Sequence, residues 1–469
     1  MITLKKDNEC VVCGKCVISC PKGAICYKLG KYGNYFPVID EELCVKCHIC
    51  EQVCEKEIDF DANYLSSQYY IGYYKNEVIR ENSSSGGIFS ALAMYILQHH
   101  GEIIGATYDK DTQLVKHISV SREEDLKKLR KSKYVQSDWI GAYKMIKEAI
   151  SLNKWILVSG TPCQIETLKE CFCNYEKIFF VDLFCHGVTM AKIFRDYINS
   201  FEGRVRNIDF RHQKQGEDTN FTIRILQENG NVVEEEWGQN ILCELFINSS
   251  VLKKSCLTCK YAVKKHKSDI TIGDFADWRD YAGSLGISYS LASIISINSK
   301  KGMQLFEAIQ EELVFYQLED IDIITSYYGE HEHKYGDWGY EKNLWEKFNR
   351  MYLKKGFIIA AIELLYNKEL ELIYRIDKIK EEGEDLIIYG AGIIGKRINW
   401  MISMLRESWN IRCFVETKKS KDWIGNIPVI SLKELSETHD NALVVVSVSD
   451  KYIDDIVYEL KKIGIRFIF

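Results

Sequence analysis

The chain has 469 residues, of which 46% are hydrophobic and 27% are charged, and its formal net charge is −6 at pH 7. This length exceeds what one hydrophobic core organises and predicts about three domains. The negative charge balance gives no reason to expect a nucleic-acid partner. The first ten residues, "MITLKKDNEC", contain no apolar segment typical of a secretory signal, and apolar runs such as 291–297 and 442–448 are too short to cross a bilayer. We therefore expect a soluble, cytoplasmic protein without a membrane span.

The sequence contains 17 cysteines. An odd number in a long chain without a signal does not fit the disulfide scaffold of a small secreted protein. Many of the cysteines are clustered at the spacing of metal ligands, which favours metal-binding thiolates in a reducing, anaerobic compartment.

Two cysteine runs near the amino terminus have the same spacing. "CVVCGKCVISCP" begins at Cys10 and "CVKCHICEQVC" at Cys44, and in each run two, two and three residues separate successive cysteines. Two matching runs favour two 4Fe–4S clusters over zinc, which Cys-x-x-Cys pairs also bind. Pro21 follows the first run, whereas Glu55 stands at the corresponding place after the second.

With these runs, residues 1–60 resemble a bacterial-type ferredoxin domain, which we expect to extend to residue 62. In that arrangement the fourth cysteine of each run ligates the cluster of the other run. The resemblance therefore implies one 4Fe–4S cluster held by Cys10, Cys13, Cys16 and Cys54, and a second held by Cys44, Cys47, Cys50 and Cys20.

The segment after the second run opens with "SSSGG" at 83–87. An amphipathic helix is predicted from Ile88 to His100, ending at Gly101, and "EIIGATYD" predicts a strand. Serines and glycines at a helix start present backbone N–H groups that suit a phosphate or the edge of a flavin, although serine there more often only caps the helix. Farther on, "LRKSKYVQSDWIGAY" is predicted to be a polar stretch between two helices.

Two predicted strands each deliver a cysteine to one edge of a sheet. "KWILVSGTPCQIETLKECF" predicts a buried strand, a sharp turn that ends in Cys163, and a helix. "KIFFVDLFCHGV" predicts a second apolar strand followed by Cys185 and His186. The carboxyl ends of parallel strands are where α/β sheets place ligand sites.

A pair at Cys256 and Cys259, in "CLTCKYAVKKHKSDITIGDF", brings the number of such thiols to four, which is what one further cluster requires. Zinc remains an alternative, as does a redox-active or nucleophilic Cys163 at the helix start. The other cysteines are interpreted as structural, Cys26 as a small buried residue: Cys26, Cys171, Cys173, Cys243 and Cys413.

Five motifs occur in a fixed order along the chain: "SSSGGIFSALA", "SKYVQS", "SGTPCQ", "DLFCHG" and "CLTCKYA…SDITIGDF". With them, residues 1–310 resemble the beta-subunit family of coenzyme F-420 hydrogenases and dehydrogenases. The resemblance implies FAD beside a 4Fe–4S cluster, and transfer of electrons between clusters and an acceptor. The residues it implies at the flavin are Ser84, Ser85, Gly86, Gly87, Phe89, Lys133, Tyr134, Gln136, Ser137, Thr161, Pro162 and Gln164. Two departures, Val188–Met190 after "CHG" and Ala276–Trp278 after "GDF", leave the substrate open.

Two side chains are candidates for catalysis. Lys133 is expected to stabilise the reduced flavin ring electrostatically. His186 is expected to donate a proton, although a lone histidine after a strand more often serves as a structural hydrogen-bonding group, and His117 is a weaker candidate of the same kind.

The carboxyl-terminal third is predicted to begin with a helical connector at 311–383. It includes a loop at 331–343, and the two histidines of this loop are expected to face solvent, with metal binding as the alternative.

A small module follows at 384–469. Its "DLIIYGAGIIGKR" places Gly390, Gly392 and Gly395 between a strand and a helix, as in a dinucleotide-binding fingerprint, and Glu416 ends the next strand, near where a ribose would bind. The module resembles the small Rossmann modules of sugar-modifying enzymes. It is expected either to bind NAD or a nucleotide-sugar or to serve only as a docking module.

Together these features predict an α/β protein with an α+β ferredoxin domain (1–62), a mixed α/β catalytic core that binds FAD and a cluster (63–310), the connector (311–383) and a Rossmann-like parallel sheet (384–469). We expect an oxidoreductase that passes electrons from ferredoxin or another low-potential donor through 4Fe–4S clusters to FAD, and on as hydride to coenzyme F-420 or a small, sugar-linked acceptor. A homo-oligomer is compatible with the sequence. The alternative is a non-catalytic electron-transfer subunit that docks on a separate catalytic partner.

Overall fold

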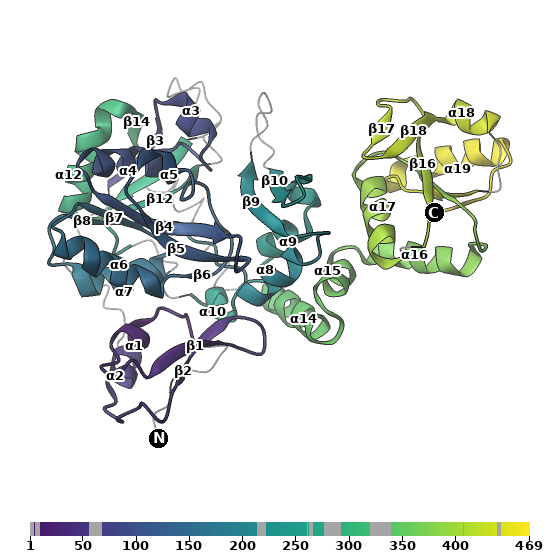
Figure 1. The fold of residues 1–469 in the computed structure, drawn as a ribbon. Helices are drawn as coiled ribbons and strands as arrows, with labels where there is room; N and C mark the ends of the chain where they lie inside the picture. The colour runs from purple at the N-terminus through teal and green to yellow at the C-terminus, as the bar shows by residue number, and fades with distance from the viewer. Residues whose placement is uncertain are drawn as a thin grey trace. The chain divides into compact units, whose positions relative to one another are not determined.

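The computed structural model describes residues 4, 10–55, 68–212, 222–259, 261, 266–275, 292–318, 339–406, 408–438 and 442–469. The chain divides into two compact units, residues 1–357 and 358–469 (Figure 1). Among the described residues, no helix combines the length and the apolar character that crossing a membrane requires. The predicted domain boundaries inside these units remain predictions.

The amino-terminal part of the first unit is built around the two cysteine runs. Each run leads into a short helix, α1 (Lys15–Ile18) or α2 (Ile49–Glu55), and an antiparallel hairpin of β1 (Ile25–Leu29) and β2 (Tyr35–Ile39) lies between them in sequence. Cys16 and Cys50 are buried in a small core with Ile25. A core this small suits a domain in which bound clusters supply much of the folding energy.

A nine-stranded mixed sheet forms the centre of the first unit, in the order β14-β3-β13-β12-β8-β7-β4-β5-β6. The four central strands β12, β8, β7 and β4 are mutually parallel. They are apolar along most of their length, as expected of strands covered on both faces. The strands are β3 (Gln68–Tyr74), β4 (Glu102–Asp109), β5 (Leu114–Val120), β6 (Ser137–Asp138), β7 (Ile156–Ser159), β8 (Ile178–Leu183), β12 (Ile270–Phe275), β13 (Ala292–Ile297) and β14 (Leu313–Leu318).

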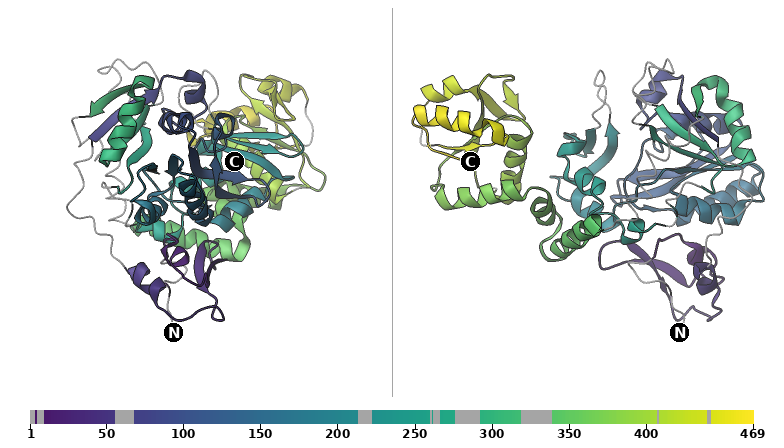
Figure 2. Two further views of the ribbon diagram at one scale, coloured as in Figure 1. Left: turned by 60° about the vertical axis from the view of Figure 1, so that its left-hand side comes forward. Right: turned by 180° about the vertical axis from the view of Figure 1, so that it is seen from behind.

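Helices cover both faces of this sheet (Figure 2). On one face α4 (Ile88–Gln98) and α12 (Lys300–Ile309) bury their apolar sides in one core cluster. On the other face α6 (Ile140–Ser151) and α7 (Pro162–Phe172) pack in a second cluster. The short helices α3 (Glu77–Glu81) and α5 (Glu123–Leu126) lie before α4 and before α6 in sequence.

A three-stranded antiparallel sheet, β11-β10-β9, follows α8 (Ala191–Ile198) in the chain. A 3₁₀ turn and two short helices follow it in the chain, and the long helix α14 comes later, after β14. The elements are β9 (Val205–His212), β10 (Thr222–Gln227), β11 (Val232–Glu236), η1 (Trp237–Gln239), α9 (Ile241–Ile247), α10 (Lys254–Leu257) and α14 (Gly339–Lys355).

The connector is less helical than predicted. After α12 and the 3₁₀ turn η2 (Gln310–Glu312), the segment Leu313–Leu318 forms strand β14, which pairs antiparallel with β3 at the edge of the central sheet. Its sequence "LVFYQL" is rich in β-favouring residues, and the adjacent edge of β3 needs a partner for its backbone groups. The two histidines predicted in the following loop lie outside the described residues.

The second unit contains α15 (Phe357–Leu365) from residue 358, α16 (Asn367–Ile379) and a six-stranded sheet of order β17-β18-β16-β15-β19-β20. All of its strands except β17 are parallel, so the predicted small parallel sheet and the predicted α/β class are confirmed. Its elements are β15 (Leu386–Tyr389), α17 (Ile393–Leu405), β16 (Ile411–Glu416), β17 (Trp423–Ile424), β18 (Ile427–Ser431), α18 (Leu432–Glu437), β19 (Leu443–Val446), η3 (Asp450–Tyr452), α19 (Ile453–Lys462) and β20 (Phe467–Ile468).

Candidate cofactor site

A cavity of about 300 Å³ lies at the carboxyl ends of the parallel strands β7, β8 and β12. Open α/β sheets place ligands at this edge, and the volume falls at the lower end of the range for small-molecule pockets. Nine residues predicted at the flavin line this cavity: Ser84, Ser85, Gly87, Phe89, Lys133, Tyr134, Ser137, Thr161 and Gln164. Gln136 and Pro162 line a smaller pocket beside it.

The serine loop before α4 is held by hydrogen bonds to segments distant in sequence. The backbone N–H of Ser132 donates to Ser84 Oγ at 2.7 Å, and Ser85 Oγ donates to the carbonyl of Ala292 at 2.8 Å. The loop is therefore fixed between the Lys131–Tyr134 segment and β13, with its serines on the cavity wall.

The two glycines of this loop are required by its geometry. A Cβ on Gly86 would stand 2.5 Å from the carbonyl oxygen of Gly72 in β3. Gly87 has φ of +79°, a left-handed conformation that favours glycine, and is the N-cap residue of α4. Together they bring the N-terminus of an eleven-residue helix to the cavity, where its backbone N–H groups favour an anionic ligand group.

Lys133 lines the cavity from the segment between α5 and α6. Its ammonium lies 3.3, 3.0 and 2.5 Å from the carbonyl oxygens of Lys128, Leu129 and Arg130. Burial lowers the pKa of Lys133 to about 7, whereas the three carbonyls favour the charged form. Near pH 7 the Lys133 side chain can therefore carry a positive charge at little cost in free energy. The predicted role of Lys133, to stabilise a reduced flavin, would require this charge.

Arg211 on β9 joins three walls of the cavity, and the sequence did not reveal it. Its guanidinium donates to the Tyr134 hydroxyl at 2.9 Å, to the Asp274 carboxylate at 2.5 Å and to the Ser84 carbonyl at 3.1 Å. The side chain of Arg211 is 7% exposed. Its strand carries other charged residues as well, so nothing local distinguishes Arg211, and its partners are 63 to 127 residues away.

Both candidate histidines line the cavity. Burial lowers the pKa of His117 to about 4, so its ring is neutral at pH 7. Its Nε2 lies 3.1 Å from the carbonyl oxygen of Ser159, which can only accept, so Nε2 carries the proton. The ring of His186 packs 5.2 Å from that of Phe246. Its predicted proton-donor role remains a prediction.

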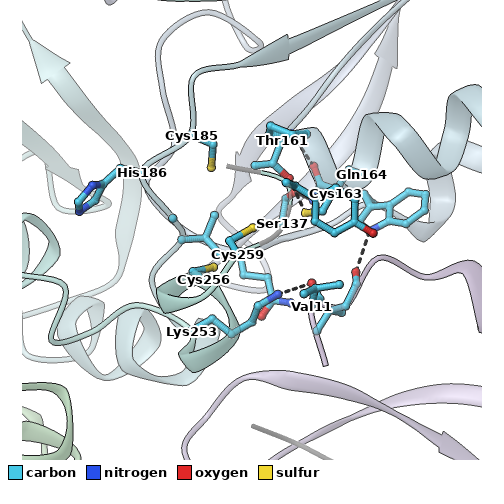
Figure 3. A pocket seen from close by; sticks show the side chains of 17 residues that line it. Val11, Ser137, Thr161, Cys163, Gln164, Cys185, His186, Lys253, Cys256 and Cys259 are labelled. Atoms are coloured by element: carbon cyan, nitrogen blue, oxygen red, sulfur yellow. Dashed lines mark hydrogen bonds between the residues drawn. The ribbon is translucent and has the colours of Figure 1, made fainter. Parts of the chain in front are cut away.

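The four predicted core thiols line one small pocket next to the cavity, together with the buried ring of Trp139. Figure 3 shows the sulfur atoms of Cys163, Cys185, Cys256 and Cys259 around a common space, with the ring of His186 directed away from them. Burial raises the pKa of the Cys185 thiol, and the neighbouring Cys256, Cys163 and Cys259 raise it further. Four mutually interacting thiols from three segments are a suitable donor set for a 4Fe–4S cluster.

Cys163 is positioned by the first turn of α7. Thr161 and Gln164 form a capping box, in which the Gln164 side chain accepts from the Thr161 N–H at 3.1 Å, and Pro162 occupies the start of the helix. Gln164 also donates to Ser137 Oγ at 3.0 Å. The predicted turn after β7 thus exists, and its capping residues separate the thiol pocket from the cavity.

The cavity and the thiol pocket share a wall. The residues that line both are Ser137, Thr161, Gln164, Cys185, His186, Gly187 and Val188. A cluster and a flavin bound in these two spaces would be separated only by these side chains.

The amino-terminal cysteines lie near one another. Burial raises the pKa of the Cys16 thiol, and Cys13, Cys10, Cys54 and also Cys50 raise it further, so Cys16 is near thiols of both predicted sets. Which cluster each thiol would hold remains a prediction. The second set lines one surface pocket: Cys20, Cys44, Cys47 and Cys50. Among the described residues, no three Cys, His, Asp or Glu side chains converge as a single metal ion would require.

Three predictions about other cysteines can be compared with the structure. Cys26 is exposed on β1, which contradicts its interpretation as a buried residue, because its side chain faces outward from the two-stranded hairpin. Cys171 and Cys173 are also exposed at the end of α7. Cys243 and Cys413, which are interpreted as structural, are buried.

The glycines of the carboxyl-terminal module differ in what surrounds them. Gly390 has φ of +116°, and a Cβ on Gly395 would stand 1.8 Å from the carbonyl oxygen of Gly390. Gly392 has no atom within 4 Å of the Cβ position. These are the three roles of a dinucleotide fingerprint: tight turn, open approach for a ligand, and close helix packing. The Glu416 carboxylate accepts from the N–H and hydroxyl of Ser420. Nucleotide binding here remains a prediction.

Comparison with known proteins gives a family for part of the chain. Residues 153–322 match the family described as the carboxyl terminus of the coenzyme F-420 hydrogenase/dehydrogenase beta subunit, so the resemblance read from the motifs is confirmed there. The coenzyme F-420-dependent sulfite reductase of Methanocaldococcus jannaschii is 32% identical over 172 residues, covering 35% of this chain and 25% of that protein. A second relative is the subunit designated F of the F(420)H(2) dehydrogenase of Methanosarcina mazei. It is 24% identical over 206 residues, which cover 40% of this chain and 58% of that protein.

The chain therefore spans between a quarter and three fifths of the length of these two relatives. A chain in a solved structure of the F-420-reducing nickel–iron hydrogenase complex from Methanosarcina barkeri is similar with a TM-score of 0.40 and 19% identity. That similarity covers 63% of this chain and 96% of the other.

Proposed function

Because residues 153–322 belong to the coenzyme F-420 hydrogenase/dehydrogenase beta-subunit family, we propose that the chain is an iron–sulfur flavoprotein oxidoreductase. It passes electrons from a ferredoxin-type donor through 4Fe–4S clusters to FAD, and on as hydride to an acceptor. The observation that carries this proposal is the wall shared by the thiol pocket and the 300 Å³ cavity. Clusters move single electrons and a flavin delivers two, so adjacent sites for both are what such an enzyme needs.

The residues of the chain hold these groups and set their environment. Cys163, Cys185, Cys256 and Cys259 would hold the core cluster. The serine loop and α4 would bind the flavin from one side, and Lys133 would place a positive charge against it. Arg211 fixes the loop, Tyr134 and Asp274 in one arrangement, which keeps the cavity formed before a ligand arrives.

The ferredoxin part suggests a direction of entry. The first cysteine run contacts the core: Ser255 Oγ donates to the carbonyl of Cys10 at 3.0 Å. The second run carries Cys47, which is exposed, and beside it Leu43 and Val45, which are 54% and 56% exposed. The cluster of the second run would therefore accept electrons from the donor, and the cluster of the first run would pass them to the core.

The acceptor we propose is coenzyme F-420 or a related deazaflavin, because both relatives carry coenzyme F-420 in their names. One observation favours the second candidate, an electron-transfer subunit without its own small substrate: the Methanosarcina mazei relative is named as a subunit. A small sugar-linked acceptor is a further candidate for the nucleotide-binding fingerprint of the second unit.

Turnover by the isolated chain separates these functions. The protein would be purified without oxygen, reduced with dithionite and mixed with coenzyme F-420, while the absorbance of the deazaflavin is followed. A catalytic chain bleaches many equivalents of coenzyme F-420, and the Cys163→Ser variant bleaches far fewer. Three reduced clusters and one reduced FAD store enough electrons for about two equivalents of coenzyme F-420. Bleaching of no more than this amount would contradict the enzyme and support the subunit.

A further inference from the structure

Lys253 is a buried lysine between the ferredoxin cysteines and the core cysteines. It is 4% exposed and is the N-cap residue of α10, the helix that carries Cys256. Its ammonium donates to the carbonyl of Val11 in the first cysteine run (Figure 3). The side chain lines the same pocket as the four core thiols.

Lys253 lines a pocket whose other polar groups include the four core thiols. Within the part of the chain that the structure describes, no Asp or Glu oxygen lies within 4.0 Å of the Lys253 ammonium, in contrast to Lys169, which pairs with Asp269 at 2.8 Å. Burying an unpaired charge costs several kcal/mol. The Lys253 ammonium is instead near thiols of both sets, since it lowers the pKa of Cys10 and of Cys163, although burial raises the pKa of both thiols by more. These thiols would become thiolates on binding a cluster and would then supply the negative charge.

Neighbouring contacts hold the Cys10 loop against two segments of the core, α10 and the start of α6. Besides the bond from Ser255 to Cys10, the indole N–H of Trp139 donates to the carbonyl of Val12 at 3.5 Å. Gly14 packs so closely that a Cβ would stand 2.5 Å from the Trp139 ring. These contacts are neutral, whereas Lys253 brings a positive charge to the contact between the Cys10 loop and α10.

We propose that the Lys253 ammonium is the shared counter-charge of the first ferredoxin cluster and the core cluster, and that it raises the reduction potential of both relative to the outer cluster. Lys253 is thus a positioning residue for electron transfer, and this inference rests on the proposed function. A positive charge stabilises the state with one more electron, and its effect is large where water is excluded. The outer cluster, which Cys20, Cys44, Cys47 and Cys50 would hold in a separate pocket, serves as the control inside the same molecule.

The test is a redox titration of the full-length protein, purified without oxygen and followed by electron paramagnetic resonance of the reduced clusters. Lys253→Met removes the charge and keeps the length of the side chain, Lys253→Arg keeps the charge, and Ser255→Ala removes the adjacent neutral hydrogen bond. We expect Lys253→Met to make reduction of two of the three clusters about tenfold less favourable, a shift of about 59 mV to lower potential for a one-electron couple. Lys253→Arg and Ser255→Ala should leave all three potentials near those of the unaltered protein.

Equal shifts in Lys253→Met and Lys253→Arg, no shift in either, or a shift of all three clusters would each overturn the inference. Should Lys253→Met lose iron, retention of iron in Lys253→Arg supports the role of the charge, and loss in both variants overturns it. If the unaltered protein contains fewer than three clusters, the proposed function fails first. If it contains three and Lys253→Met titrates as the unaltered protein does, only the inference about Lys253 fails.

Discussion

Replacing Arg211 should weaken flavin binding by disconnecting three walls of the cavity. In Arg211→Met the hydrogen bonds to Tyr134, Asp274 and Ser84, at 2.9, 2.5 and 3.1 Å, are all lost. A hydrogen bond that involves a charged group contributes about 1.5–3 kcal/mol. The Asp274 side chain is 39% exposed, so water replaces part of its interaction. The net loss is therefore about 3 kcal/mol rather than the sum of three such bonds.

This free energy holds the cavity walls in the arrangement that binds FAD. Its loss should therefore raise the apparent dissociation constant for FAD by up to roughly 100-fold. The assay is titration of flavin-depleted protein with FAD, followed by the quenching of flavin fluorescence. Arg204→Met is the control, because Arg204 immediately precedes the same strand and donates to the carbonyl of Lys110, and neither residue lines the cavity. Iron content and thermal unfolding of each variant show whether the rest of the chain is intact.

The reasoning fails if Arg211→Met, with unchanged iron content and unfolding temperature, binds FAD within a few-fold of the unaltered protein. It also fails if Arg204→Met weakens binding equally, because the effect would then belong to the strand and not to the connection between the walls.

Three further predictions follow from single sites. Cys163→Ser should lose about four of about twelve irons per chain. Cys171→Ser, altered at an exposed position of the same helix, should lose none. Equal iron content in both variants would contradict the core cluster. Burial lowers the pKa of Lys133 to about 7, so above this pH the lysine is largely neutral and should take up a proton when negative charge arrives on the flavin. The flavin midpoint potential should then fall by about 30 mV per pH unit more steeply above pH 7 than in Lys133→Met, and parallel slopes would refute the role of Lys133. Gly395→Ala forces a Cβ to 1.8 Å from a carbonyl oxygen and should destabilise the second unit by about 1–3 kcal/mol, which faster proteolysis of the full chain would show. Gly392→Ala, in open space, should leave the rate of proteolysis unchanged. Equal rates in the two variants would count against the close packing of α17.

The sequence predicted those parts of the fold and site in which local spacing determines structure. The two cysteine runs, the strand and turn before Cys163, and the parallel sheet of the second unit all follow from periodicity and from residues a few positions apart. The predicted flavin residues depended on the family resemblance, and the structure places most of them on one cavity.

The parts that were missed depend on contacts between distant segments. Nothing near Arg211 or Lys253 in the sequence marks them, because their functions arise from partners 63 to 242 residues away. The sequence predicts a helical connector where strand β14 forms, since these six residues become a strand only by pairing with the edge of β3. The usual burial of cysteine predicts a buried Cys26, but a two-stranded hairpin has too little core to cover it.

The central claim is that one chain carries three clusters and a flavin, and the most direct test is to measure iron, acid-labile sulfide and flavin per chain after purification without oxygen. The account predicts about twelve irons, an equal amount of sulfide and one FAD. About eight irons without flavin would contradict it: only the ferredoxin part would then hold clusters, and the core would be a docking surface.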